Sequence, residues 1–95
     1  MSEDAALQRR EVYYSGVVQG VGFRYTVRHI AARLPVTGYV QNLPDGRVKL
    51  VAEGHPTDLE RLLHAISREM GPYIDRVDQQ IGPAKGEFRS FEIRF

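Results

Sequence analysis

Residues 11–34 read EVYYSGVVQGVGFRYTVRHIAARL, and this stretch decides the fold. Its first part, Glu11 to Val18, is rich in β-branched and aromatic side chains and predicts a strand. Gln19 to Gly22 is a glycine-containing turn. After the turn, apolar residues recur at helical spacing and predict an amphipathic helix of about three turns, stopped by Pro35. These apolar residues are Phe23, Val27, Ile30, Ala31 and Leu34.

The next segment predicts a β-hairpin. Val36 to Asn42 has the composition of a second strand, and Arg47 to Gly54 alternates between apolar and charged residues as a third. Between them, Pro44-Asp45-Gly46 predicts the turn, because proline presets its own φ and glycine accepts a positive φ. The two strands are therefore expected to pair directly.

A second helix is predicted from Thr57 to Met70. Thr57 and Glu60 have the spacing of a capping box, and Gly71-Pro72 is typical of a helix end. The expected buried stripe consists of Leu59, Leu62, Leu63, Ile66 and Met70.

Ile74 to Ile81 then predicts a fourth strand, and Phe91 to Phe95 a short final one. The order β-α-β-β-α-β is that of the split βαβ, so we expect a ferredoxin-like α+β sandwich with an antiparallel sheet and both helices on one face. Residues 1–10 are predicted to be a flexible N-terminal arm, and residues 11–95 the domain itself.

This topology predicts that two distant segments meet. A strand–helix–strand crossover leaves its two strands parallel, so the first two strands end at the same edge of the sheet. With the third strand between them, they lie two strand spacings apart, or ~10 Å. The loop before Arg24 and the residue Asn42 should therefore face a common site.

The composition describes one globular domain. The chain has 95 residues, of which 42% are hydrophobic and 26% charged, ordinary values for a folded domain. Its net charge is +1 with scattered basic residues, which disfavours a nucleic-acid partner. It has no cysteine for a disulfide, a thiolate nucleophile or a metal site. No apolar run resembles a signal peptide or reaches the ~18 residues of a membrane span, so we expect a cytoplasmic protein without a membrane partner.

The turn between the first strand and the first helix suits a phosphoryl group. Gly20 and Gly22 permit unusual dihedral angles, so successive backbone N–H groups can converge on an anion. The helix that begins near Phe23 adds unpaired N–H groups and the positive end of its dipole. Arg24 in the first turn opposes that dipole, and a bound anion would reverse the sign of the effect.

Each feature also has a purely structural explanation, and the pattern alone leaves both open. The glycines could form only a tight turn, Arg24 could be a solvated helix residue, and Asn42 could bond its own backbone at the hairpin turn. The segment matches neither the dinucleotide-binding glycine fingerprint nor the P-loop pattern.

Taken together, these residues resemble the acylphosphatase family. Gly16 to Arg24 (GVVQGVGFR) resembles its signature G-x-V-Q-G-V-x-F-R. Gly38 to Val48 (GYVQNLPDGRV) is similar to its second signature, a glycine-aromatic-V-x-N run followed by a D-G-x-V hairpin. Phe91 to Phe95 (FEIRF) looks like the family's ending, with Phe95 in place of the commoner tyrosine. The resemblance runs from about Val12 to the last residue.

The resemblance implies a metal-free hydrolase without a cofactor, which converts an acyl phosphate to a carboxylate and inorganic phosphate. It implies that Arg24 binds the phosphoryl group and that Asn42 positions the attacking water. The implied phosphate loop consists of Gln19, Gly20, Val21, Gly22, Phe23 and Arg24. Inorganic phosphate is expected to inhibit competitively. The physiological substrate stays open among acetyl phosphate, carbamoyl phosphate and 1,3-bisphosphoglycerate.

The remaining polar and aromatic residues predict no second site. His29 and His64 are interpreted as helix-surface residues and His55 as a turn residue, because the three lack metal-ligand spacing. Asp75 and Asp78 are assigned to a solvated strand edge. The tyrosines are interpreted as packing residues: Tyr13, Tyr14, Tyr25 and Tyr39.

Two other functions are weighed against the enzyme. An RNA-recognition module predicts an aromatic and basic run on the third strand, but Arg47 to Glu53 contains no aromatic residue. A domain that handles carbamoyl phosphate leads the much longer hydrogenase-maturation proteins. This chain stops at Phe95 after a complete fold, so we expect a free-standing, monomeric enzyme.

Overall fold

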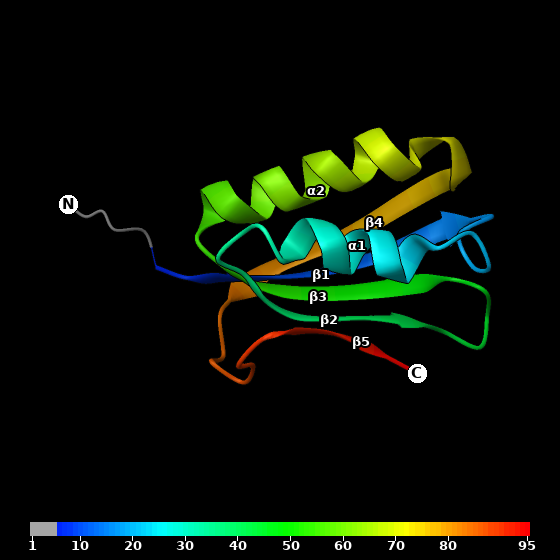
Figure 1. Ribbon diagram of the computed structural model, residues 1–95. Coiled ribbons are helices and arrows are strands. Elements are labelled where there is room, and N and C mark those ends of the chain that lie inside the picture. Colours follow the sequence, from blue (N-terminus) through cyan, green and yellow to red (C-terminus); the bar gives the residue numbers. More distant parts are fainter. Residues whose placement is uncertain (1–5) are drawn as a thin grey trace.

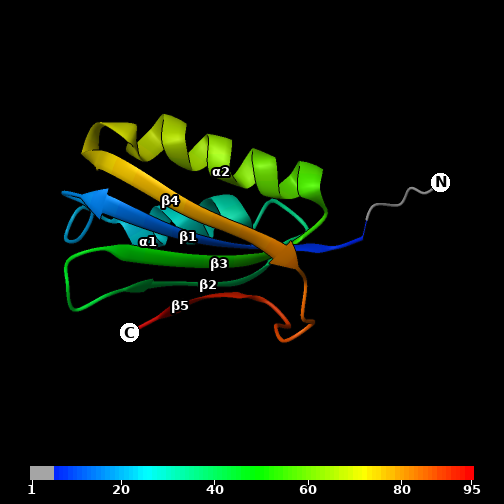
Figure 2. The same cartoon turned by 180° about the vertical axis from the view of Figure 1, so that it is seen from behind.

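The computed structural model describes residues 6–95, which form a five-stranded sheet with two helices on one face (Figure 1). Seen from behind, the strands lie in front of the first helix, and the second helix runs above β4 (Figure 2). The predicted α+β sandwich is confirmed. Its elements in chain order are β1 (Gln8–Gly16), α1 (Phe23–Ala31), β2 (Thr37–Asn42), β3 (Val48–Gly54), α2 (Pro56–Met70), the short 3₁₀ helix η1 (Gly71–Tyr73), β4 (Ile74–Pro83) and β5 (Phe91–Arg94).

The sheet is mixed, whereas the sequence predicted an antiparallel one. Its strand order is β4-β1-β3-β2-β5, and only β2 and β5 pair in parallel. The reason is the short return at the end of β4. This strand ends beside Gln8, at the edge of the sheet where β2 begins. Residues 84–90 reverse the chain there, so β5 must run in the direction of β2 (Figure 1).

The core lies between the sheet and the helices. Val12, Leu50 and Ile66, from β1, β3 and α2, are fully buried in it. The predicted stripe of α2 is confirmed at four positions, while Leu63 is only partly buried. Because the helices cover one face, this core fixes how α1 and the turn before it sit on the sheet.

The first strand begins three residues earlier and ends two residues earlier than predicted. Gln8 already pairs with both Gly54 and Pro83, so the predicted arm overlaps β1, and residues 1–5 of that arm lie outside the described part. At its other end the register with β4 shifts between Ser15 and Gly16. A Cβ on Gly16, where φ is 130°, would lie 2.4 Å from the carbonyl oxygen of Tyr73. Long-range pairing and this close approach therefore set both bounds.

The helix ends also differ from the local predictions. Helix α1 ends at Ala31, and the N–H of Leu34 donates to the carbonyl of Ala31 in a tighter turn before Pro35. Helix α2 begins at Pro56 with His55 as its N-cap, so the predicted Thr57–Glu60 capping box is wrong. Proline suits the first helical position because that N–H needs no partner.

At its other end α2 does not finish in a left-handed glycine. Gly71 has φ −48° and ψ −42°, and the chain continues into η1. The 3₁₀ turn provides the stop expected from Gly71-Pro72. Within residues 6–95, neither helix is long and apolar enough to cross a membrane.

Candidate active site

A cavity of about 270 Å³ opens where β1 turns into α1, and Asn42 reaches it from the end of β2. The meeting of these segments was predicted from the topology. Strand β3 lies between β1 and β2, and its residue Val48 pairs with both Tyr14 and Asn42. The cavity is lined by Val18, Gly20, Gly22, Phe23, Arg24, Tyr25 and Asn42.

The backbone of the loop turns sharply at two glycines before α1 begins. Gly20 and Gly22 have φ values of 80° and 78°, the left-handed region that favours glycine. Gly22 is the N-cap of α1, and the N–H of Thr26 donates to its carbonyl at 3.0 Å as the first bond of the helix. The N–H groups of residues 23–25 precede that bond and have no carbonyl within the helix to pair with. They are available to an anion in the cavity.

The guanidinium of Arg24 contacts the last two residues of the chain, Arg94 and Phe95. Its Nη1 donates to the carbonyl oxygen of Arg94 at 3.3 Å, and its Cζ lies 4.8 Å from the centroid of the Phe95 ring. Neither contact neutralises the guanidinium, and the first turn of α1 contains no acidic residue. Since a guanidinium has five N–H donors, this cation keeps donors for a ligand.

The Asn42 side chain is not used to close the hairpin turn. The Leu43 N–H donates to the carbonyl of Arg47 at 2.8 Å, and the Gly46 N–H donates to the carbonyl of Leu43 at 3.1 Å. Asp45 accepts the N–H of Arg47 at 3.1 Å, and this bond, with the nearby guanidinium, lowers the pKa of the Asp45 carboxyl. Oδ1 of Asn42 is buried and accepts no hydrogen bond from the described residues. Asparagine's usual role in a turn therefore does not explain this residue.

Two residues of the predicted loop do not line the cavity. Gln19 turns its side chain away and donates from Nε2 to the carbonyl oxygens of Leu43 at 2.8 Å and Arg47 at 3.0 Å. Val21 packs against the core cluster. These two residues could contact a ligand in the cavity only through their backbone groups.

Sequence reasoning missed some residues around the site. Tyr25, interpreted as a packing residue, is 61% exposed and lines the cavity. Its position two residues into the helix was the available signal. By contrast, Tyr14 and Tyr39 are buried as predicted. No sequence pattern indicated the contacts of Arg24 with Arg94 and Phe95, because they depend on the pairing of β5 with β2.

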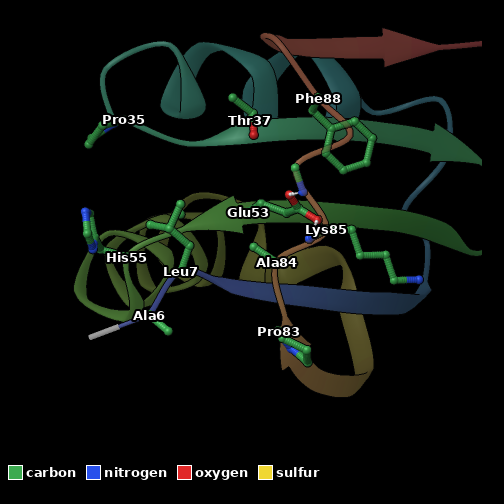
Figure 3. A pocket seen from close by; sticks show the side chains of 12 residues that line it. Ala6, Leu7, Pro35, Thr37, Glu53, His55, Pro83, Ala84, Lys85 and Phe88 are labelled. Carbon is green, nitrogen blue, oxygen red and sulfur yellow. Dashed lines mark hydrogen bonds between the residues drawn. The ribbon is translucent and has the colours of Figure 1, made fainter. Parts of the chain in front are cut away.

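A second hollow, of about 780 Å³, lies at the opposite end of the sheet (Figure 3). Its buried Glu53 is already used by the chain, since the carboxylate accepts the N–H groups of Lys85 at 2.9 Å and Gly86 at 3.0 Å and also Nη1 of Arg9 at 3.1 Å. The carboxylate is thus fully engaged by the chain, and its negative charge disfavours a phosphoryl group in this hollow, although Thr37, His55 and Lys85 also line it. Within residues 6–95, His29, His55 and His64 are exposed, and no cluster of three histidine or acidic side chains could hold a metal ion.

The fold and the cavity define a small ferredoxin-like domain whose first helix begins at a cavity lined by two glycines, an arginine and an asparagine. Comparison with known proteins places it more narrowly. The acylphosphatase family model matches residues 10–93. An acylphosphatase of Yersinia pseudotuberculosis is 46% identical over 85 residues, which cover 87% of this chain and 91% of that protein. The chain therefore belongs to the acylphosphatase family and is an enzyme of that class.

Solved structures agree with this assignment. The crystal structure of the Bacillus subtilis acylphosphatase superposes with a TM-score of 0.84 at 31% identity, covering 94% of this chain and 99% of that one. Full-length HypF, in a phosphate- and nucleotide-bound form, superposes with a TM-score of 0.85 at 29% identity. That match covers 100% of this chain but 13% of HypF. The fold thus occurs both by itself and within a longer protein.

Proposed function

We propose that this enzyme hydrolyses the carboxyl-phosphate bond of acyl phosphates by in-line attack of a water positioned by Asn42. The observation that carries the proposal is the single cavity that joins Asn42 to Arg24 and to the free N–H groups at the start of α1. Arg24 and the amides of residues 19–24 would hold the phosphoryl group, and Asn42 would hold the nucleophile.

The chemistry of an acyl phosphate agrees with so sparse a site. Its leaving group is a carboxylate, whose conjugate acid has a pKa of ~4–5, so it departs without a general acid. Phosphoryl transfer through a loose transition state chiefly requires alignment and stabilisation of the equatorial oxygens. A guanidinium and several aligned amides supply that stabilisation, so we propose that the reaction needs no metal.

Asn42 would act by position, since a carboxamide is too weak a base to deprotonate water. Its amide can orient a water toward the phosphorus, which is a proximity effect. The proton of the water would pass to a phosphoryl oxygen of the substrate. The product phosphate has the same contacts available and should inhibit competitively.

The enzyme would discriminate little between the acyl groups of different substrates. Beyond the glycines, Arg24 and Asn42, the cavity wall consists of Val18, Phe23 and the exposed Tyr25, with no acidic lining residue. We therefore propose broad specificity that includes small acyl phosphates, carbamoyl phosphate among them.

The test is hydrolysis of benzoyl phosphate, followed by its absorbance, in the presence of EDTA. Turnover that is insensitive to EDTA is expected, and activity that appears only with added Mg²⁺ or Zn²⁺ would overturn the metal-free mechanism. Arg24→Ala should weaken both substrate binding and phosphate inhibition. Arg28→Ala, an exposed arginine on the same helix, is the matched control.

Asn42→Ala tests the second half of the site. We expect it to lower kcat by about 100-fold or more through loss of alignment, with phosphate inhibition little changed. Gln80→Ala, on the remote strand β4, is the control for loss of a carboxamide. Near-normal turnover of Asn42→Ala would argue against water positioning by this residue.

A further inference from the structure

We infer that Gln19 is a positioning residue, whose side-chain amide fixes the hairpin that carries Asn42 against the phosphate loop. The inference rests on the proposed function and adds one residue to it. Its basis is the pair of hydrogen bonds from Nε2 to the carbonyls of Leu43 and Arg47, at 2.8 and 3.0 Å.

Both hydrogens of the amide are used, and both acceptors belong to the mouth of the turn. The carbonyl of Leu43 also accepts the N–H of Gly46, and the carbonyl of Arg47 accepts the N–H of Leu43, which are the backbone bonds that close the hairpin. Gln19 therefore spans the two strand ends just beyond Asn42 and Val48, the last pair of β2 and β3. The next residue of the chain after Asn42 is thereby bonded to the loop.

The loop is the fixed side of this contact. Val18 and Phe23 flank it and are buried in the core, with 0% and 2% of their surfaces exposed. The hairpin turn has no such anchor, because Pro44, Asp45 and Gly46 are exposed. Loss of the Gln19 bonds should therefore free the turn and Asn42 more than it disturbs the loop.

The alternative is that Gln19 serves the site only through its backbone N–H. In that case replacing the side chain would leave the N–H in place and change nothing in the reaction. The side chain would then be a surface carboxamide whose bonds carry no catalytic consequence. The two possibilities predict different kinetics.

The experiment is Gln19→Met, which removes both donors and keeps the length of the side chain. The carbonyls of Leu43 and Arg47 keep their backbone partners, so we expect the unfolding midpoint to shift by less than about 5 °C. We expect kcat on benzoyl phosphate to fall about 10-fold from misalignment, with phosphate inhibition changed less than about 2-fold. Gln80→Met is the matched control.

The double variant Gln19→Met/Asn42→Ala tests whether Gln19 acts through Asn42. If it does, the second substitution adds little to the loss caused by Asn42→Ala. Multiplicative losses in kcat would overturn the inference. So would a fall in phosphate affinity that parallels the fall in kcat, because Gln19 would then act on the anion loop.

Gln19→Glu gives a signature that a merely structural role would not produce. The ionised carboxylate cannot donate and faces two carbonyl oxygens, whereas the protonated form has one donor. The kcat of this variant relative to the wild type should rise as the pH falls toward about 5. Gln19→Met should show no such recovery, and neither should Gln19→Glu in the Asn42→Ala background. A pH profile of Gln19→Glu parallel to that of Gln19→Met would contradict the inference.

The results also separate this inference from the proposed function. Normal turnover of Asn42→Ala would overturn water positioning, whatever Gln19 does. Impaired Asn42→Ala together with a normal kcat for Gln19→Met would leave the proposed function standing and overturn only the role of Gln19.

Discussion

At the scale of single residues, the proposed site contains a cation placed where a helix disfavours it. Arg24 lies in the first turn of α1, and its guanidinium contacts the carbonyl of Arg94 at the end of β5 and the ring of Phe95, the next residue. A carbonyl contact and a cation–π contact at an exposed position each contribute about 1 kcal/mol or less, which is comparable to the unfavourable dipole term. A bound phosphoryl group would add a favourable charge interaction at the same helix end.

Arg24→Lys separates charge from shape at this position. Lysine keeps the charge but loses the planar fork that grips two phosphoryl oxygens. We expect the inhibition constant of phosphate to rise about 10-fold, with a fall in kcat/KM of at least that size. Steady-state kinetics with phosphate as inhibitor provide the measurement, and Arg28→Lys is the control. Equal phosphate inhibition in wild type and Arg24→Lys would show that charge alone suffices.

The glycines of the molecule differ in how much stability is lost when alanine replaces them. A Cβ on Gly22 meets no atom within 4 Å, so Gly22→Ala is opposed only by its φ of 78° and should lose about 1 kcal/mol of stability. A Cβ on Gly38 would lie 1.9 Å from the carbonyl oxygen of Val51. Gly38→Ala should therefore cost about 3 kcal/mol or more. Urea unfolding of the two variants checks this order, and a reversed order would contradict it.

At the scale of elements, β5 connects the far end of the sheet to the candidate active site. The preceding residues, 84–90, are tied to β3 by the buried carboxylate of Glu53, and β5 itself ends at the carbonyl that holds Arg24. Phe88 of this loop packs edge-on against Tyr39, with ring centroids 5.8 Å apart, and covers part of the sheet face without helices. The loop thus fixes the start of the strand that supports Arg24.

The Glu53 anchor should make stability depend on pH. Burial alone would raise the pKa of Glu53, but the N–H groups of Lys85 and Gly86 and the Arg9 guanidinium outweigh it and hold the pKa below its ordinary value. A carboxyl with a lowered folded-state pKa stabilises the fold above its unfolded pKa of about 4.3, and this contribution is lost as the pH falls through the folded value. Wild type should thus lose stability on acidification below pH ~4.

Glu53→Gln isolates this contribution. At pH 7 the variant should be less stable than wild type by about 1–3 kcal/mol, because charge-assisted bonds become neutral ones. The difference should shrink as the pH falls from 5 toward 3. Denaturant unfolding at several pH values measures it, with the exposed Glu92→Gln as control. A difference that stays constant down to pH 3 would contradict the assignment.

The elements themselves were predictable where local pattern decides them. The order of strands and helices followed from apolar periodicity and turn residues, and the buried stripe of α2 followed from its spacing. The predicted capping box was wrong because Pro56 occupies the first helical position and starts the helix one residue before Thr57. The predicted start of β1 was wrong because the strand extends to Gln8, which pairs with Gly54 and Pro83, both distant in sequence.

At the scale of the whole molecule, the handedness of one crossover brings the two halves of the site together. This rule holds for nearly every strand–helix–strand unit, so the meeting of Asn42 with the glycine loop could be predicted from sequence. The side-chain contacts that fix the relative positions of these segments could not be predicted from the sequence. Gln19 bonds to carbonyls 24 and 28 positions away, and Arg24 bonds to one 70 positions away. Backbone acceptors carry no residue identity that a sequence pattern could reveal.

The central strand β3 sets the separation of the two halves, which leads to a prediction about Val48. This residue is fully buried and pairs with Tyr14 on one side and Asn42 on the other, so its packing determines how β1 and β2 end. Val51, in the same strand, is equally buried but pairs with Glu11 and Tyr39, away from the cavity. Val48→Ala and Val51→Ala remove the same volume and should each cost about 1–3 kcal/mol.

Only Val48→Ala should also impair the reaction. Relaxation around the lost methyl groups would shift Asn42 relative to the loop, and a shift well below 1 Å is enough for a fall in kcat of about 3–10-fold. Val51→Ala should keep the wild-type kcat under conditions where both variants are fully folded. Far-UV circular dichroism establishes the folded fraction, and benzoyl phosphate hydrolysis gives kcat. Equal kcat values for the two variants would contradict this role of Val48 and would mean that the site tolerates small changes in strand spacing.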